Sequence, residues 1–78
     1  MKRWTTIAES IIERFKLTCP EYASRILDYS VPVIATLLRA DTPYPVSIGY
    51  ELWFRLSGNG FVIYREQDKA TQLLNGDL

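Results

Sequence analysis

The sequence contains no histidine, and its only cysteine is Cys19. Histidine is the commonest general base and the commonest transition-metal ligand, so its absence weighs against acid–base catalysis and against a metal site. A single cysteine cannot form a disulfide within the chain, and it suggests a reducing compartment. We therefore expect a cytoplasmic protein that is not an enzyme and that uses no cofactor and no metal.

An excess of charge of either sign is also missing, because nine basic residues balance nine acidic ones. Domains that bind duplex DNA usually carry clustered Lys and Arg, so a neutral chain makes nucleic acid an unlikely partner. No apolar stretch reaches membrane-spanning length, and no continuous apolar run follows the basic residues Lys2 and Arg3. The sequence therefore predicts neither a signal peptide nor a membrane-bound protein.

With 78 residues, the chain is expected to form one small domain over 1–78. Such a domain is near the lower size limit for folding without disulfides or metals, and its core contributes no more than roughly 3–5 kcal/mol of net stability. Pairing with itself as a homodimer, or with another protein, is the remaining source of stability.

Two helices are predicted in the first part of the chain. The apolar residues of the first recur at the three-and-four spacing of one helical face: Trp4, Ile7, Ala8, Ile11, Ile12 and Phe15. Thr6 and Glu9 have the spacing of a capping box, and the helix should end near Leu17. A second capping box at Thr18 and Glu21 predicts another helix, whose inward residues are Tyr22, Ala23, Ile26 and Leu27.

A third helix is predicted from Ser30 to about Ala40, with Pro32 in its first turn. The alternative is one long helix over 20–40 that is kinked at Pro32. We favour a break, because a proline in a helix interior costs about 3 kcal/mol. The stretch 31–38 is apolar around most of its circumference, which is typical of a helix inside the fold.

Side chains alternate with a period of two over 46–56, which predicts a long, half-buried strand. A turn follows at 57–60, and 61–66 is expected to return as the second strand of a β-hairpin. Either hairpin alignment places these residues on one face: Leu52, Phe54, Leu56, Phe61 and Ile63. This apolar face should cover the helices.

The opposite face of the hairpin carries Trp53, Arg55, Val62 and Tyr64. Trp, Tyr and Arg are the residue types most enriched at binding hot spots, so this face is the predicted partner-binding surface. The alternative is that a short last helix covers it, with Asp68 as its cap and its leucines as the contacts.

The first strand of this hairpin is longer than its partner, so residues 46–50 should form an unpaired strand edge. Val46 and Ile48 in this edge are therefore further candidate contacts. Strand addition there would join two copies of the chain, or the chain and a target protein.

The predicted fold class is α+β: two or three N-terminal helices packed on a C-terminal β-hairpin, followed by a short terminal helix. The predicted function is a small protein-binding module, such as an accessory regulator or inhibitor. One alternative is a winged helix-turn-helix DNA-binding regulator, with Thr36 and Arg39 on its reading helix and Arg55 or Arg65 on the wing. Another is a structural subunit of a larger assembly.

Overall fold

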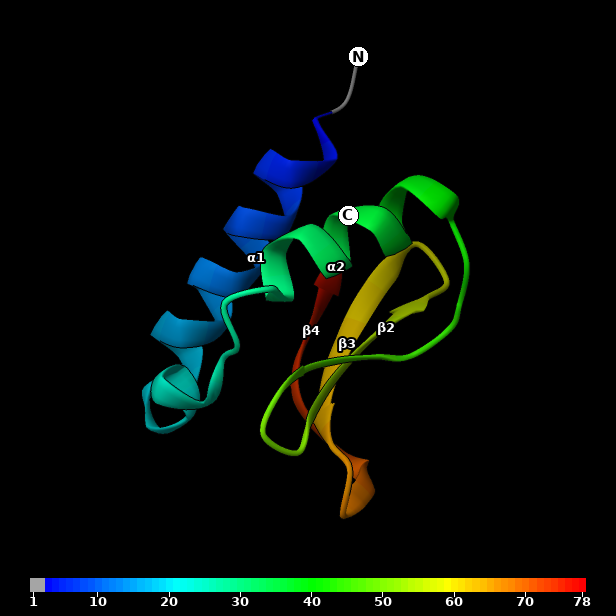
Figure 1. The fold of residues 1–78 in the computed structure, drawn as a ribbon. Coiled ribbons are helices and arrows are strands. Elements are labelled where there is room, and N and C mark those ends of the chain that lie inside the picture. The colour runs from blue at the N-terminus through cyan, green and yellow to red at the C-terminus, as the bar shows by residue number, and fades with distance from the viewer. Residues whose placement is uncertain (1–2) are drawn as a thin grey trace.

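The computed structural model describes residues 3–78, which form two α-helices, a short 3₁₀ helix and a four-stranded antiparallel sheet (Figure 1). The elements follow one another as α1 (Trp4–Thr18), η1 (Pro20–Arg25), α2 (Ser30–Ala40), β1 (Val46–Gly49), β2 (Leu52–Ser57), β3 (Gly60–Arg65) and β4 (Asp68–Asp77). The strands lie in the sheet in chain order, each paired with its sequence neighbour. The predicted α+β class is confirmed, although the hairpin is only part of a larger sheet.

Helix α1 buries the face that its apolar spacing predicts, with Ala8, Ile11, Ile12 and Phe15 in the core. Its boundaries do not use the predicted capping boxes. The N-cap residue is Arg3, and no side chain caps this end of the helix. The helix ends at Thr18, one residue beyond the predicted end.

The second predicted helix is a six-residue 3₁₀ helix, η1, instead of an α-helix. It stops because Ile26 adopts an extended conformation and forms a β-bridge with Gly49. The predicted break before α2 is confirmed, since α2 begins at Ser30. Pro32 is the third residue of α2, where the backbone nitrogen has no partner within the helix, so the proline is tolerated there.

The predicted long strand over 46–56 is wrong, because the chain turns back at residues 50–51 and forms two strands, β1 and β2. Glu51 has a φ of 60°, a left-handed conformation that lets the chain reverse direction. Tyr50 therefore lies in a turn and is 69% exposed, although its place in the alternation predicted a buried side chain.

The predicted terminal helix is also wrong, because residues 68–77 form strand β4 beside β3. The Asp68 carboxylate does accept cap-like hydrogen bonds, from the Thr71 hydroxyl and from the backbone N–H groups of Ala70 and Thr71. No helix follows, because Leu74 pairs with Ile63 and lies in the core. A bulge in the pairing lets the adjacent Leu73 pack against the same core.

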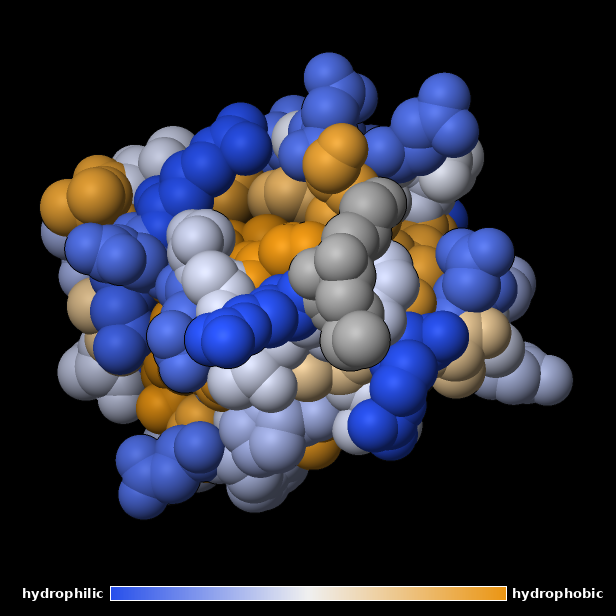
Figure 2. Space-filling model, turned by 90° about the horizontal axis from the view of Figure 1, so that it is seen from above, coloured by the Kyte–Doolittle hydropathy of each residue, from blue (hydrophilic) through white to orange (hydrophobic). Residues whose placement is uncertain are grey.

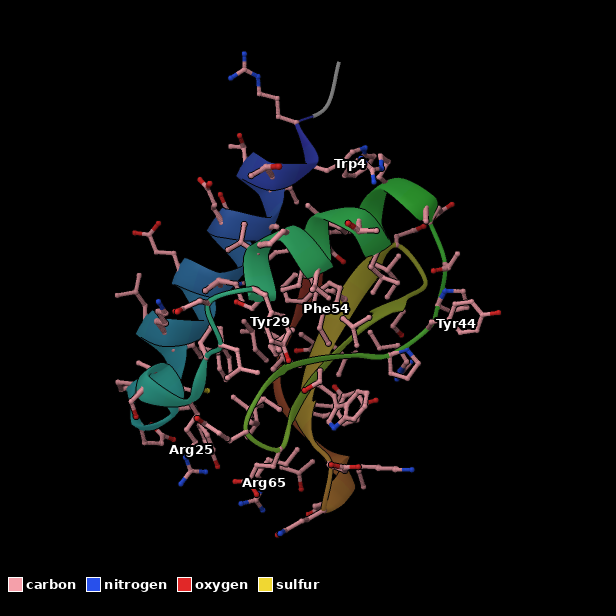
Figure 3. The ribbon with its side chains drawn as sticks, viewed as in Figure 1. Trp4, Arg25, Tyr29, Tyr44, Phe54 and Arg65 are labelled. Atoms are coloured by element: carbon pink, nitrogen blue, oxygen red, sulfur yellow. The ribbon has the colours of Figure 1, made fainter. Side chains whose placement is uncertain are left out.

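The hydrophobic core lies between the two helices and one face of the sheet. Phe54 and Phe61 stack there with their ring centroids 5.7 Å apart, and Figure 3 shows Phe54 beneath α2. All five residues predicted for the apolar face are buried: Leu52, Phe54, Leu56, Phe61 and Ile63. We call this side of the sheet the core face and the other side the outer face.

The predicted open edge at residues 46–50 is wrong for residues 48–50, because residues 25–27 of the same chain pair with them. The Leu27 N–H donates to the Ile48 carbonyl at 2.9 Å, and the Tyr50 N–H donates to the Arg25 carbonyl at 3.1 Å. Gly49, between these two bonds, forms the β-bridge with Ile26. The chain thus protects this part of the sheet edge with its own backbone.

Candidate protein-binding surface

The outer face of the sheet brings together the four hairpin residues predicted as a partner-binding surface. Strand pairing places Trp53 opposite Tyr64, and Arg55 opposite Val62. Because paired residues of antiparallel strands share a face, the two aromatic rings and the guanidinium lie on one side of the two central strands. Ser47 of β1 and two amides of β4, Gln72 and Asn75, extend the same face.

These outer-face residues differ in how far their neighbours cover them. Val62 is only 4% exposed, whereas Trp53, Arg55 and Tyr64 are each partly exposed. A partner would therefore contact the two rings and the arginine, with Val62 as the apolar floor beneath them. No helix covers this face among residues 3–78, because α1 and α2 both pack on the core face.

A hollow of about 130 Å³ opens on the outer face beside the two rings. Pro45, Trp53 and Tyr64 form its apolar walls, and Glu66 and Lys69 line it with one charge of each sign. The sequence could not reveal this hollow, because Pro45 reaches it only through the turn that brings β1 back beside β2. Its apolar walls suit an apolar side chain of a partner.

Arg55 is chemically distinct from two other arginines of the molecule. The Arg25 guanidinium forms an ion pair with Glu51 at 2.6 Å, and Arg14 donates a hydrogen bond to the Asn75 carbonyl at 3.2 Å. Within residues 3–78, the Arg55 guanidinium has neither an ion pair nor a hydrogen bond to another residue. Arg55 is therefore a half-buried cation, and no described residue of the chain accepts a hydrogen bond from its guanidinium.

The two candidate contacts in β1 lie on the core side of the sheet. Ile48 is fully buried in the core, and Val46 is half-buried against it. Ile48 therefore offers neither its side chain nor its carbonyl to a partner. The alternation places both residues on the same face as Leu52 and Phe54. They were candidate contacts only because the edge was expected to be unpaired, whereas the Leu27 N–H donates to the Ile48 carbonyl.

The residues proposed for DNA reading do not come together. Thr36 and Arg39 are exposed on α2, and the Thr36 hydroxyl donates to the Pro32 carbonyl within that helix. Arg55 points to the outer face, on the side of the sheet away from α2. Figure 3 shows Arg65 at the lower end of the sheet, whereas α2 crosses its upper end.

Cys19 lies in the core and has a structural environment. Its thiol donates a hydrogen bond to the Leu73 carbonyl at 3.4 Å, which ties the end of α1 to β4. Burial, and then the negative charge of Glu21, raise the pKa of this thiol. Within residues 3–78, no group of three or more potential ligands is close enough together to hold a metal ion. The same residues include no helix with the length and apolar character needed to cross a membrane.

Further concavities lie on the helical side of the molecule. An apolar groove of about 420 Å³ runs between α2 and the connection to β1, and Tyr44 points outward beside it (Figure 3). A wider hollow of about 540 Å³ lies where α1 begins, and core residues Leu38 and Leu56 help to line it. Figure 2 views the molecule from this end and shows hydrophobic side chains surrounded by hydrophilic ones. The groove has no charged lining residue, and the wider hollow is lined by one charge of each sign, Arg39 and Asp41. The outer face differs from both, because its arginine has no acidic partner among the described residues.

Comparison with protein-family models, with curated proteins and with solved structures found no match to this chain.

Proposed function

We propose that this chain is a non-enzymatic protein-binding module whose contact surface is the outer face of the sheet. The observation that supports the proposal is the grouping of Trp53, Tyr64 and Arg55 on the two central strands, opposite the face that holds the helices. These are the side chains that contribute most to binding energy in protein interfaces. Both strands are paired on each side within the sheet, so little free energy is lost in ordering this surface when a partner binds.

The proposed role is that of a small accessory regulator or inhibitor in the cytoplasm. Such a protein acts by occupying a surface of a larger one, and it needs an interface rather than a catalytic group. The outer face is suited to this, because aromatic rings and one guanidinium predominate there. The partner we propose is a polypeptide segment of another protein, and a second copy of the chain is the alternative that sedimentation tests.

The experiment is a selection of random dodecapeptides displayed on phage against the immobilised protein. Affinities of the selected peptides are then measured by fluorescence anisotropy for the wild type, for Trp53→Ala and for Tyr50→Ala. Tyr50→Ala is the matched control, because it removes an exposed aromatic ring from the β1–β2 turn. We expect Trp53→Ala to weaken binding at least tenfold, as hot-spot truncations do, and Tyr50→Ala to change it less than twofold.

Circular dichroism and urea unfolding establish whether Trp53→Ala remains folded, since its side chain is half-buried. NMR chemical-shift changes in the wild type, on addition of a selected peptide, give a map that needs no variant. The proposal is wrong if peptides bind without dependence on Trp53 and the shifts map to the groove beside α2. If sedimentation velocity shows that the wild type is a dimer and that Trp53→Ala is a monomer, a second copy of the chain is the partner. Large closed or filamentous oligomers would instead support the structural-subunit alternative.

A further inference from the structure

The chemistry of the partner follows from the position of Arg55. Arg55 lies on β2, an interior strand, next to Trp53 on the same face and directly opposite Val62. Its side chain is half-buried among these residues. Among residues 3–78, no carboxylate pairs with it and no backbone carbonyl accepts its N–H groups.

In the free protein, water accepts the hydrogen bonds of this guanidinium. A partner that covers the outer face removes that water, and a buried cation left without acceptors is strongly destabilising. Any partner that binds here must therefore supply the acceptors itself. A carboxylate is the best match, since it takes two parallel N–H bonds from a guanidinium and neutralises its charge.

The two recognition elements of the face also have a defined spacing. Trp53, which lines the hollow, and Arg55 are two residues apart on one strand, so their Cα atoms are about 6.6 Å apart. An extended peptide that runs along β2 has the same separation between its own side chains at positions i and i+2. Such a peptide can place one side chain in the hollow and the next on the same side at Arg55.

We infer that the outer face recognises an extended acidic segment of a partner protein. In that segment an Asp or Glu pairs with Arg55, and an apolar side chain two residues away enters the hollow lined by Pro45, Trp53 and Tyr64. The inference rests on the proposed function and specifies the partner's chemistry. Nearby Glu66 and Lys69 offset each other at the rim of the hollow, so Arg55 supplies the unbalanced charge.

The test is a second peptide selection in parallel, against wild type and against Arg55→Glu. Wild type should enrich Asp or Glu two positions from an apolar residue, whereas Arg55→Glu should enrich Lys or Arg at that position. For one selected acidic peptide, Arg55→Glu and the neutral Arg55→Gln should each lower the affinity at least tenfold. When the acidic residue of the peptide is changed to Lys, Arg55→Glu should bind the changed peptide at least fivefold more tightly than it binds the acidic one.

Arg39→Glu is the matched control, because Arg39 is an exposed arginine on α2 and away from the outer face. We expect it to change the affinity less than twofold. Circular dichroism verifies that each variant is folded. If Arg55→Glu does not fold, the affinity of the neutral Arg55→Gln for the acidic peptide still tests the inference.

Two outcomes separate this inference from the proposed function. If selected peptides depend on Trp53 but show no acidic preference and tolerate Arg55→Gln, the inference is wrong while the proposed function stands. If no selected peptide depends on Trp53, both fail.

A fluorescent dT12 oligonucleotide is the third probe. Its binding, if abolished by Trp53→Ala and Arg55→Gln, would show that the rings stack on bases and that a phosphate pairs with Arg55, which overturns the acidic-peptide inference.

Discussion

Gly49→Ala is expected to destabilise the fold, because the backbone of residues 25–27 lies directly against this glycine. A Cβ atom at Gly49 would stand 2.0 Å from the Arg25 carbonyl oxygen, well short of the 3.4 Å at which ordinary contact begins. The obstacle is backbone, so no side-chain rotation can relieve it. Residues 25–27 must move away from β1 to accommodate the methyl group.

That movement breaks the two hydrogen bonds that join residues 25–27 to the edge of β1, from Leu27 N–H to Ile48 and from Tyr50 N–H to Arg25. At about 0.5–1.5 kcal/mol each, their loss lowers the free energy of unfolding by about 1–3 kcal/mol. Because the core of a domain of this size supplies no more than roughly 3–5 kcal/mol, that loss is a large fraction of its stability. With a urea m-value of about 1 kcal/mol/M, the unfolding midpoint should fall by about 1–3 M.

Gly76→Ala is the matched control. A Cβ atom at Gly76 would stand 2.5 Å from the Arg14 guanidinium, which is the end of a flexible side chain and can swing into solvent. Arg14 then loses its hydrogen bond to the Asn75 carbonyl, which lowers the free energy of unfolding. Alanine also reduces the conformational entropy of the unfolded chain, which raises the free energy of unfolding, so the net change should stay below about 1 kcal/mol.

The assay is urea unfolding followed by circular dichroism, together with amide exchange at Leu27 and Tyr50 by NMR. Both amides should exchange faster in Gly49→Ala than in Gly76→Ala. Equal midpoints for the two variants, or unchanged exchange at these amides, would refute the conclusion that residues 25–27 pair with β1.

Three further predictions concern charge. The pKa of Cys19 is raised in the folded state by burial and by Glu21, so its contribution to stability is fully present below the unfolded pKa, about 9.0, and is lost as pH rises above it. Urea midpoints should therefore fall less between pH 8 and pH 10 in Cys19→Ala than in wild type, and equal falls would contradict this. The Arg25–Glu51 ion pair is partly exposed. A double-mutant cycle with alanine should therefore give a coupling energy of no more than about 1 kcal/mol, which decreases as salt is added. A larger coupling energy that does not depend on salt would contradict this prediction. Random duplex DNA should give no anisotropy change at physiological salt, because the chain is neutral, whereas binding that weakens steeply with salt would move the DNA-binding alternative ahead.

Local patterns in the sequence determined the two faces of the central hairpin. Period-two alternation assigns Leu52, Phe54 and Leu56 to one side, and Trp53 and Arg55 to the other, because successive side chains of a strand point in opposite directions. The structure confirms both assignments. The buried face of α1 and the start of α2 at Ser30 were predictable for the same kind of reason, since helix spacing and proline geometry act over a few residues.

The tertiary structure decided what depends on distant backbone contacts. Asp68 makes cap-like hydrogen bonds that suit a helix, yet residues 68–77 form a strand, because β3 offers a free edge and Leu74 gains burial against Ile63. The chain leaves the helical conformation at Ile26, because residues 26 and 27 pair with the edge of β1.

Some features of the candidate surface were likewise predictable from the sequence, and others depended on the tertiary structure. Its residues Trp53, Arg55 and Tyr64 could be read from the alternation, but their exposure could not, because it required β4 to form a strand instead of a covering helix. The hollow that Pro45 completes depends on the turn at residues 50–51. Alternation and helical spacing are local properties of a sequence, whereas strand neighbours and covered edges result from competition among distant segments for the same hydrogen bonds and the same apolar surface.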